Sequence, residues 1–301
     1  MPDRPNMPRR ARQHLVSLYK NFFLSRKQWN VILDKEIRSI EKVHSPLYEN
    51  TCLHTAVVFD CSTASYRQWL TRAKSSFLNV RYPHKKALEF FFSAMLLNIQ
   101  KDDIVLDAAG GRSEYLSNIR NVVGCRNLYV NDQIYSTGNV KRGGVNFVGG
   151  DVTAIGLPDG AVTKIACHHA VEHFRGDKDA RFVLEISRLL KTGGRACILP
   201  LFIADRYAEV WNIKPESCYD QRAMCIEDPS SSLPGGKDDG HFARIYDSRA
   251  LSERVLATAD SASLRATIME CTLDGQAVPD MSLNFGSRIN RPLRALVLEK
   301  V

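Results

Sequence analysis

The chain has 301 residues, of which 44% are hydrophobic and 25% are charged. This composition is typical of a soluble globular protein and excludes collagen-like, low-complexity and wholly disordered chains. Basic residues outnumber acidic ones by 41 to 33, which gives a formal net charge of +8. The first 30 residues contain seven basic residues and one acid, so most of the excess charge lies there. The overall basicity therefore gives little support to a nucleic-acid partner for the rest of the chain.

The cysteines and the hydropathy limit the class of protein further. No apolar run approaches the roughly 18 residues that a membrane span needs. The eight cysteines form no Cys-x-x-Cys pair, so the sequence predicts no metal site. Cys167 and Cys197 lie inside apolar runs and are expected to be small buried side chains in a reducing compartment. The expected location is the cytoplasm.

The first hundred residues are predicted to precede the main domain. Residues 1–45 are expected to form a basic tail and an amphipathic helix, because apolar residues recur there at spacings of three and four. Within this segment, residues 13–33 could lie on the inner face of an anionic membrane or pack across the core as a lid. Residues 46–100 are predicted to form a pre-core helical or lid region. This region is irregular to residue 82, apart from a short helix over 66–76, and ends with a buried helix over 83–98.

Residues 101–301 are predicted to form an α/β core with a Rossmann-like, seven-stranded, mostly parallel sheet and helices on both faces. The expected strands are 103–108, 127–131, 145–149, 162–168, 195–203, 263–273 and 294–300. Helices are expected over 113–123, 178–191 and 248–258, the first ended by Gly124 and the second by Gly193 and Gly194. Residues 204–247 are rich in proline and glycine and are predicted to be an irregular insertion that selects the substrate.

Three acids follow three successive predicted strands. They are Asp107, Asp132 and Asp151. Asp107 leads into a turn of small residues, Ala109-Gly110-Gly111, through which a backbone can approach a ligand closely. In open α/β sheets ligands bind outside the carboxyl ends of the strands, and an acid after the second strand can accept hydrogen bonds from ribose hydroxyls. The sequence therefore predicts a ligand site at this edge.

In this order and at these spacings, the segments resemble the class I S-adenosylmethionine-dependent methyltransferases. The resemblance covers roughly residues 84–203 and continues weakly to the end. Ala109 and Ser113 stand where the family often has glycine. The segments that carry the likeness are Asp107–Ser113, Asp132, Gly150–Val152, the pair Glu172-His173 and Leu189–Arg195.

The resemblance implies S-adenosylmethionine as the cofactor and assigns each part of it to residues. Asp107 would lie near the methionine amino group, and the backbone of Ala109, Gly110 and Gly111 would line the cofactor. Asp132 would hold the ribose. The remaining expected contacts are Asp151 and Val152 at the adenine, and His168 where cofactor and acceptor meet.

The predicted reaction is methyl transfer to an oxygen of a small-molecule or glycan acceptor. Such a reaction needs in-line positioning of the hydroxyl and a general base, for which histidine is suited near neutral pH. The candidates for catalysis are His241, His169 and His173. His173 could instead make a structural hydrogen bond behind the site, and His169 could only pack against the cofactor. His241 lies within the irregular insertion, directly after its glycine- and proline-rich stretch, and the insertion would deliver it over the strand ends.

Two other functions stay open from the sequence. One is an RNA methyltransferase that grips nucleic acid with the basic N-terminal segment. The other is a catalytically inactive protein of the same fold that binds a membrane surface or a partner through residues 13–33. No Asn-Pro-Pro-aromatic tetrapeptide follows the fourth strand, which argues against amino-methylation of adenine or glutamine. The sequence does not indicate an oligomeric state.

Overall fold

The computed structural model describes residues 56–73, 83–135, 139–213, 216–227, 242–280 and 291–301. The predicted tail and amphipathic helix of residues 1–45 lie outside these ranges, as does His241. Among the described helices, none combines the length and the hydropathy that crossing a bilayer requires.

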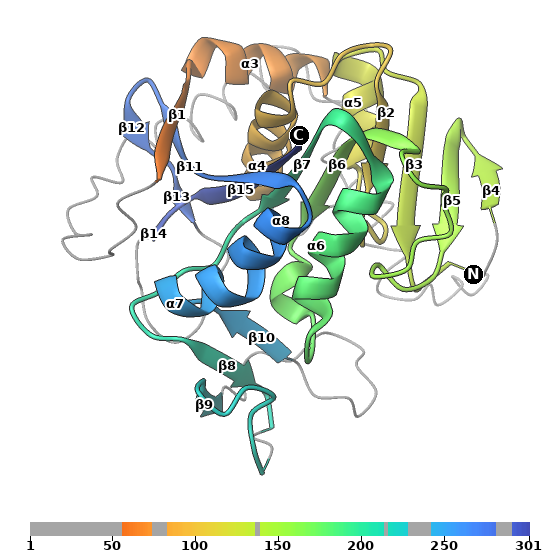
Figure 1. Ribbon diagram of the computed structural model, residues 1–301. Coiled ribbons are helices and arrows are strands. Elements are labelled where there is room, and N and C mark those ends of the chain that lie inside the picture. Colours follow the sequence, from red (N-terminus) through yellow and green to blue (C-terminus); the bar gives the residue numbers. More distant parts are fainter. Residues whose placement is uncertain (1–55, 74–82, 136–138, 214–215, 228–241, 281–290) are drawn as a thin grey trace, which may run out of the picture.

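A ten-stranded sheet forms the centre of the described part of the chain (Figure 1). Seven of its strands are those expected from the sequence, and they stand side by side in the order β11, β15, β7, β6, β2, β3, β5. The five strands from β7 to β5 are parallel to one another, whereas β15 is antiparallel to both of its neighbours. Their bounds are β2 (Ile104–Asp107), β3 (Asn127–Asp132), β5 (Val145–Gly149), β6 (Val162–His168), β7 (Leu190–Leu199), β11 (Leu264–Leu273) and β15 (Arg294–Lys300).

Three strands that the sequence did not predict extend this sheet. At one end β1 (Val57–Cys61) pairs in parallel with β11, and β12 (Gln276–Ala277) pairs with β11 as well. At the other end β4 (Asn139–Arg142) forms a hairpin with β5 through Gly143 and Gly144, both at positive φ. Residues at positive φ in a two-residue hairpin are typical of a turn that matches the strand twist. The expected irregularity of residues 46–82 is therefore wrong over 57–61, where the pairing partner lies far away in sequence.

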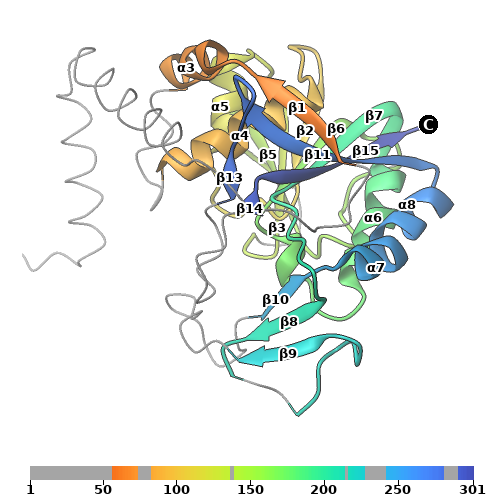
Figure 2. The same ribbon diagram turned by 90° about the vertical axis from the view of Figure 1, so that its left-hand side faces the viewer.

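Helices cover both faces of the sheet (Figures 1 and 2). On one face α3 (Thr63–Arg72), α4 (Pro83–Leu97) and α5 (Tyr115–Val122) share a core with the inner strands. On the other face lie α6 (Lys178–Leu189) and a helical stretch made of α7 (Ser248–Leu251), a π turn (Ser252–Leu256) and α8 (Ala257–Ser261). The α/β fold with helices on both faces is confirmed.

Several element ends differ from the prediction for local reasons. The helix expected over 66–76 begins at Thr63, because the Ser62 side chain accepts a hydrogen bond from the backbone N–H of Ser65. Gly124 does end α5, with φ +83. Gly193 and Gly194 do not end α6, because the chain is already extended at Leu190 and both glycines lie inside β7. The strand expected over 195–203 accordingly starts earlier, and β7 ends at Leu199.

The insertion over 204–247 is not irregular throughout. Its described residues form a small sheet of β8 (Ala208–Trp211), β9 (Met224–Glu227) and β10 (Phe242–Ile245), in the order β10, β8, β9. This small sheet lies beneath the main sheet on the side of α7 (Figure 2). A two-stranded pairing of β13 (Pro279–Asp280) with β14 (Arg291–Pro292) is separate from both.

The order in which the chain adds strands to the main sheet changes direction at β2. From β2 the chain continues to β3 and β5 on one side, and then crosses to β6 and β7 on the other. Ligands bind at such a switch point, outside the carboxyl ends of the strands. The fold therefore places the ends of β2, β3, β5 and β6 around one edge.

The buried face of α4 tests how this core is stabilised. Phe91 is 1% exposed and packs against the rings of Tyr66 and Trp69, with centroids 5.3 and 6.0 Å away. We expect Phe91→Ala to lower the free energy of unfolding by about 3–5 kcal/mol, because it removes packing contacts and leaves a cavity. The matched control is Met95→Ala, one turn further along α4 and 37% exposed, with an expected cost below about 1 kcal/mol. Urea unfolding measures both, and equal losses would contradict this packing.

Candidate functional site

The three predicted acids lie at the same edge of the sheet. Asp107 ends β2, Asp132 ends the neighbouring β3, and Asp151 follows the end of β5. The strand register pairs Asp107 with Val130, and Asp132 with Gly149. The structure thus brings together the acids that the spacing in the sequence suggested.

The turn after β2 approaches Asp107 closely. Ala109 and Gly111 both have positive φ, +51 and +54. Gly110 leaves no room for a side chain, since a Cβ there would lie 2.6 Å from the Asp107 carboxyl group. Ser113, which replaces a family glycine, donates a hydrogen bond of 2.8 Å to Oδ2 of Asp107 and accepts one from the N–H of Tyr115 at the start of α5. Ser113 therefore fixes both the carboxylate and the helix.

Beside Asp107 lies the buried ring of His168. Its Nδ1 is 3.7 Å from Oδ1 of Asp107, and the ring packs against Tyr115 and Phe90 with centroids 4.6 and 5.1 Å away. Within the described part of the chain, Oδ1 of Asp107 and both His168 nitrogens are buried and make no hydrogen bond. Buried polar groups without partners are rare and commonly mark the place of a polar ligand or water. The two residues fit a ligand with a charged, hydrogen-bonding end.

Asp132 lies next to the same turn. Its Oδ1 accepts the N–H of Ile134, and its Oδ2 lies 3.5 Å from where a Cβ on Gly111 would stand. Tyr135, which the sequence did not single out, donates its hydroxyl to the Gly111 carbonyl and packs its ring against Phe147. Tyr135 thereby joins the loop after β3 to the loop after β2.

Asp151 is held by residues of its own turn and of α6. Its Oδ1 accepts two hydrogen bonds of 2.9 Å from Thr153, and its Oδ2 accepts one of 2.6 Å from Lys178. Burial would raise the pKa of Asp151, but these hydrogen bonds outweigh it and the pKa is lowered. The neighbouring Val152 is buried in the core below.

At the end of β6, the His169 imidazole lies between two carboxylates. Its Nε2 is 2.7 Å from Oε1 of Glu89 on α4, and its Nδ1 is 3.4 Å from Oε1 of Glu172. Burial opposes its charge, but the two carboxylates prevail and raise the pKa of His169 to about 9. Burial likewise opposes the charge of Glu89, but His169 and then Lys86 lower the Glu89 pKa to about 2. His169 is thus a fixed cation at neutral pH.

Glu89 is a site residue that the sequence analysis missed. It stands in the apolar stretch of α4 between Leu88 and Phe90, and its side chain is almost fully buried. A glutamate in such a stretch is a signal, because charged side chains are rarely buried unless they are paired. Its partner could not be read from the sequence, since His169 lies 80 residues further along the chain.

His173 points its two nitrogens to different partners. Its Nδ1 is 2.6 Å from the carbonyl oxygen of Phe242 on β10, and its Nε2 is 3.8 Å from Oε1 of Glu172. A carbonyl oxygen only accepts, so Nδ1 carries the proton in this hydrogen bond. Nε2 is then the basic nitrogen of the neutral ring, on a side chain that is 38% exposed.

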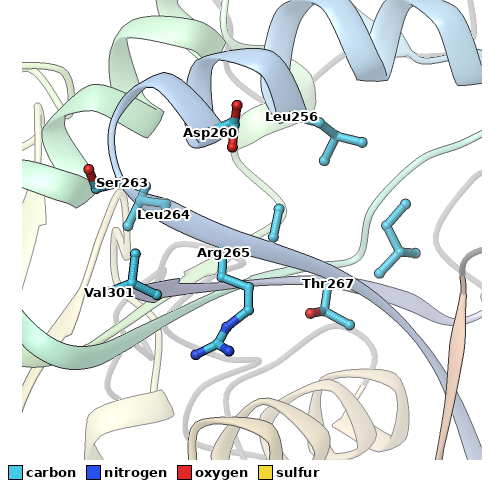
Figure 3. Close-up of a pocket in the computed structure, with 9 residues that line it drawn as sticks. Leu256, Asp260, Ser263, Leu264, Arg265, Thr267 and Val301 are labelled. Carbon is cyan, nitrogen blue, oxygen red and sulfur yellow. The ribbon is translucent and has the colours of Figure 1, made fainter.

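A hollow of about 590 Å³ lies away from this edge, between α8 and the first half of β11 (Figure 3). This half of β11 is at the amino end of the parallel strands, because β11 and β7 are both antiparallel to β15. None of the predicted site residues lines the hollow, whose walls are Leu256, Asp260, Ser263, Leu264, Arg265, Ala266, Thr267, Ile268 and Val301.

The acidic and small residues gather at the switch point of the α/β sheet, the place where open sheets of this kind bind ligands. Residues 106–198 match the family model described as a methyltransferase domain. These residues thus carry the match to a methyltransferase domain, in agreement with the resemblance of the sequence motifs to the class I S-adenosylmethionine-dependent methyltransferases. No curated protein matches the chain.

Solved structures with a similar arrangement include several methyltransferases. A Burkholderia thailandensis 1,6-didemethyltoxoflavin-N1-methyltransferase, with 1,6-didemethyltoxoflavin and S-adenosylhomocysteine bound, is 15% identical with a TM-score of 0.45, over 72% of this chain and 78% of that one. An S-adenosylmethionine-dependent methyltransferase from Mesorhizobium loti is 12% identical with a TM-score of 0.45, over 69% and 96%. One from Clostridium acetobutylicum is 13% identical with a TM-score of 0.43, over 74% and 93%.

The close approach at Gly110 makes a sharp test of the cofactor loop. We expect Gly110→Ala to weaken S-adenosylhomocysteine binding at least about tenfold, because the new methyl group must displace the Asp107 carboxyl group or the turn itself. Gly156→Ala is the matched control, since a Cβ there meets only Val148 at 3.9 Å. Calorimetric titration of both variants, with a melting curve to confirm folding, measures the effect. Wild-type affinity in Gly110→Ala would contradict the placement of this loop.

The charge of His169 predicts a pH dependence of stability. Its folded pKa lies above its ordinary value of 6.5, so its contribution is complete below about 6.5 and is lost as the pH rises through about 9. We expect the free energy of unfolding to fall more steeply between pH 6.5 and 9 in the wild type than in His169→Gln. Urea unfolding at several pH values checks this, and parallel curves for the two proteins would count against the paired cation.

Proposed function

We propose that the methyl acceptor is a hydroxyl oxygen of a small molecule or sugar, and that His173 is the general base. The observation that supports this proposal is the hydrogen bond from Nδ1 of His173 to the Phe242 carbonyl, because it directs the basic Nε2 away from the backbone. The side chain is also accessible enough to meet an acceptor.

His169 is less suited to remove a proton, although it stands closer to the strand end. Both of its nitrogens face carboxylates, and its raised pKa keeps both protonated at neutral pH. A base must accept a proton at a lone pair. We therefore assign His169 the role of a fixed positive charge beside the acceptor and not that of the base.

A hydroxyl acceptor needs these groups because it is a weak nucleophile until its proton is removed. The bound cofactor supplies an electrophilic methyl group on a sulfonium. Nε2 of His173 would take the hydroxyl proton as the oxygen attacks, and the Glu172 carboxylate, 3.8 Å from Nε2, would stabilise the imidazolium that results. General base catalysis of this kind contributes about 10²–10⁴-fold to a rate.

The same proposal gives the cofactor residues their roles. The unpartnered Oδ1 of Asp107 and the His168 ring would receive the methionine end, and Asp132 would accept hydrogen bonds from the ribose. Asp151 would face the adenine edge. The backbone of Ala109 to Gly111 would line the space between these groups.

A panel of acceptors with labelled S-adenosylmethionine tests the proposal. Sugars, phenols and catechols are compared with matched amines and thiols, and the methylated product is identified by mass spectrometry. We expect O-methyl products, and we expect His173→Ala to lower the rate by about 10²–10⁴-fold, with partial rescue by added imidazole.

The control is S-adenosylhomocysteine binding by His173→Ala, which should equal that of the wild type. Methylation confined to the amines or thiols would overturn the oxygen acceptor. A full rate in His173→Ala would overturn the assignment of the base.

A further inference from the structure

Strand β10 contacts residues 173–176 at three points. The Phe242 carbonyl accepts from Nδ1 of His173. Two residues along, the Arg244 guanidinium donates to the carbonyl of Phe174 at 3.1 Å and to that of Gly176 at 3.0 Å. The insertion is therefore joined directly to the chain on which the proposed base stands.

Arg244 has little freedom to leave this position. Its side chain is fully buried, with nitrogens 3.0 Å from Oδ2 of Asp179 and 3.2 Å from Oε1 of Glu209. Burial would raise the pKa of Asp179, but Arg254 and Arg244 together lower it, so the carboxylate stays charged. Removing one partner of a buried pair leaves an uncompensated charge, which is strongly unfavourable. The ion pairs thus fix where the guanidinium can donate.

The Glu209 carboxylate extends the connection through the small sheet. It accepts from the backbone N–H groups of Tyr219 and Asp220 at 2.7 and 3.2 Å, in the loop between β8 and β9. The Phe242 ring in turn packs against Trp211, with centroids 4.8 Å apart, and the Arg244 guanidinium lies 5.3 Å from its centroid. Phe242, which supplies the carbonyl to His173, is therefore in contact with both Trp211 and Arg244.

We propose that Arg244 is a positioning residue for His173. By fixing β10 against the carbonyls of Phe174 and Gly176, it keeps the Phe242 carbonyl within reach of Nδ1 and so maintains Nε2 as the basic nitrogen. The inference rests on the proposed function, in which Nε2 takes the acceptor proton. Under this proposal the insertion positions the catalytic base, in addition to its expected role in substrate selection.

The tautomer of His173 distinguishes a positioning role of Arg244 from a structural one. If Arg244 only stabilised the fold, its substitution would leave the tautomer ratio unchanged. In the full chain labelled with ¹⁵N-histidine, with the His173 signal assigned by its loss in His173→Gln, we expect the Nδ1–H form to dominate. Arg244→Lys keeps the charge but loses the planar fork, and we expect the ratio of Nδ1–H to Nε2–H to fall about fivefold, the worth of one hydrogen bond. We expect kcat to fall with it while the KM for S-adenosylmethionine is unchanged.

Arg254→Lys is the matched control, because Arg254 pairs with Asp179 and donates to Gly176 but donates no hydrogen bond to Phe174 within the described part of the chain. Its tautomer ratio should equal that of the wild type.

If Arg244→Lys does not fold, Glu209→Gln decides instead, since it removes a charge partner of Arg244 without touching residues 173–176 and should shift the ratio in the same direction. An unchanged ratio in the folded variant, or equal shifts in both arginine variants, overturns the inference. An unchanged rate in His173→Gln would instead overturn the base assignment itself.

Discussion

A charge that leaves water must find a partner inside the protein, and the carboxyl end of β6 is organised around that requirement. The His169 cation brings Glu89 and Glu172 together, although one comes from α4 and the other follows β6. Without the imidazolium, two buried carboxylates would face each other in a medium that solvates neither well. The arrangement therefore joins α4, which lies outside the matched methyltransferase segment, to the edge where the turn after β2 lies.

The pairing of buried charges also holds the insertion of residues 204–247 against α6. Two arginines, Arg244 and Arg254, enter the space beside α6 and meet Asp179, which α6 supplies from its first turn. The carbonyls of Phe174 and Gly176 each accept a further hydrogen bond from the Arg244 guanidinium. Because guanidinium groups donate in a fixed plane, the contact specifies direction as well as charge. The part of the edge near His173 is thus built from polar contacts, whereas the part near Asp107 is built from backbone close to small residues.

The sequence was informative for polar residues that stand directly at the ends of successive strands. Asp107, Asp132 and Asp151 each close a strand, so a pattern of apolar runs followed by acids was enough to place them at one edge. It was uninformative where the partner is distant. Glu89 and His169 are 80 residues apart. Strands β8, β9 and β10 are only four residues long each, and the ion pair that joins β10 to α6 links Arg244 to the distant Asp179. His241 remains a prediction, because it lies outside the described residues.

The pairing of β1 with β11 has a consequence for the synthesis of the chain. Val57 pairs with Met269, so the first strand of the sheet leaves the ribosome more than 200 residues before its neighbour exists. At roughly 5–20 residues per second, that interval is about 10–40 s. During this time β1 has no strand beside it, and its valines, Val57 and Val58, are half exposed even in the finished protein. The nascent chain therefore carries β1 without its parallel partner until β11 has been made, and this edge of the sheet can form only after nearly the whole chain is synthesised.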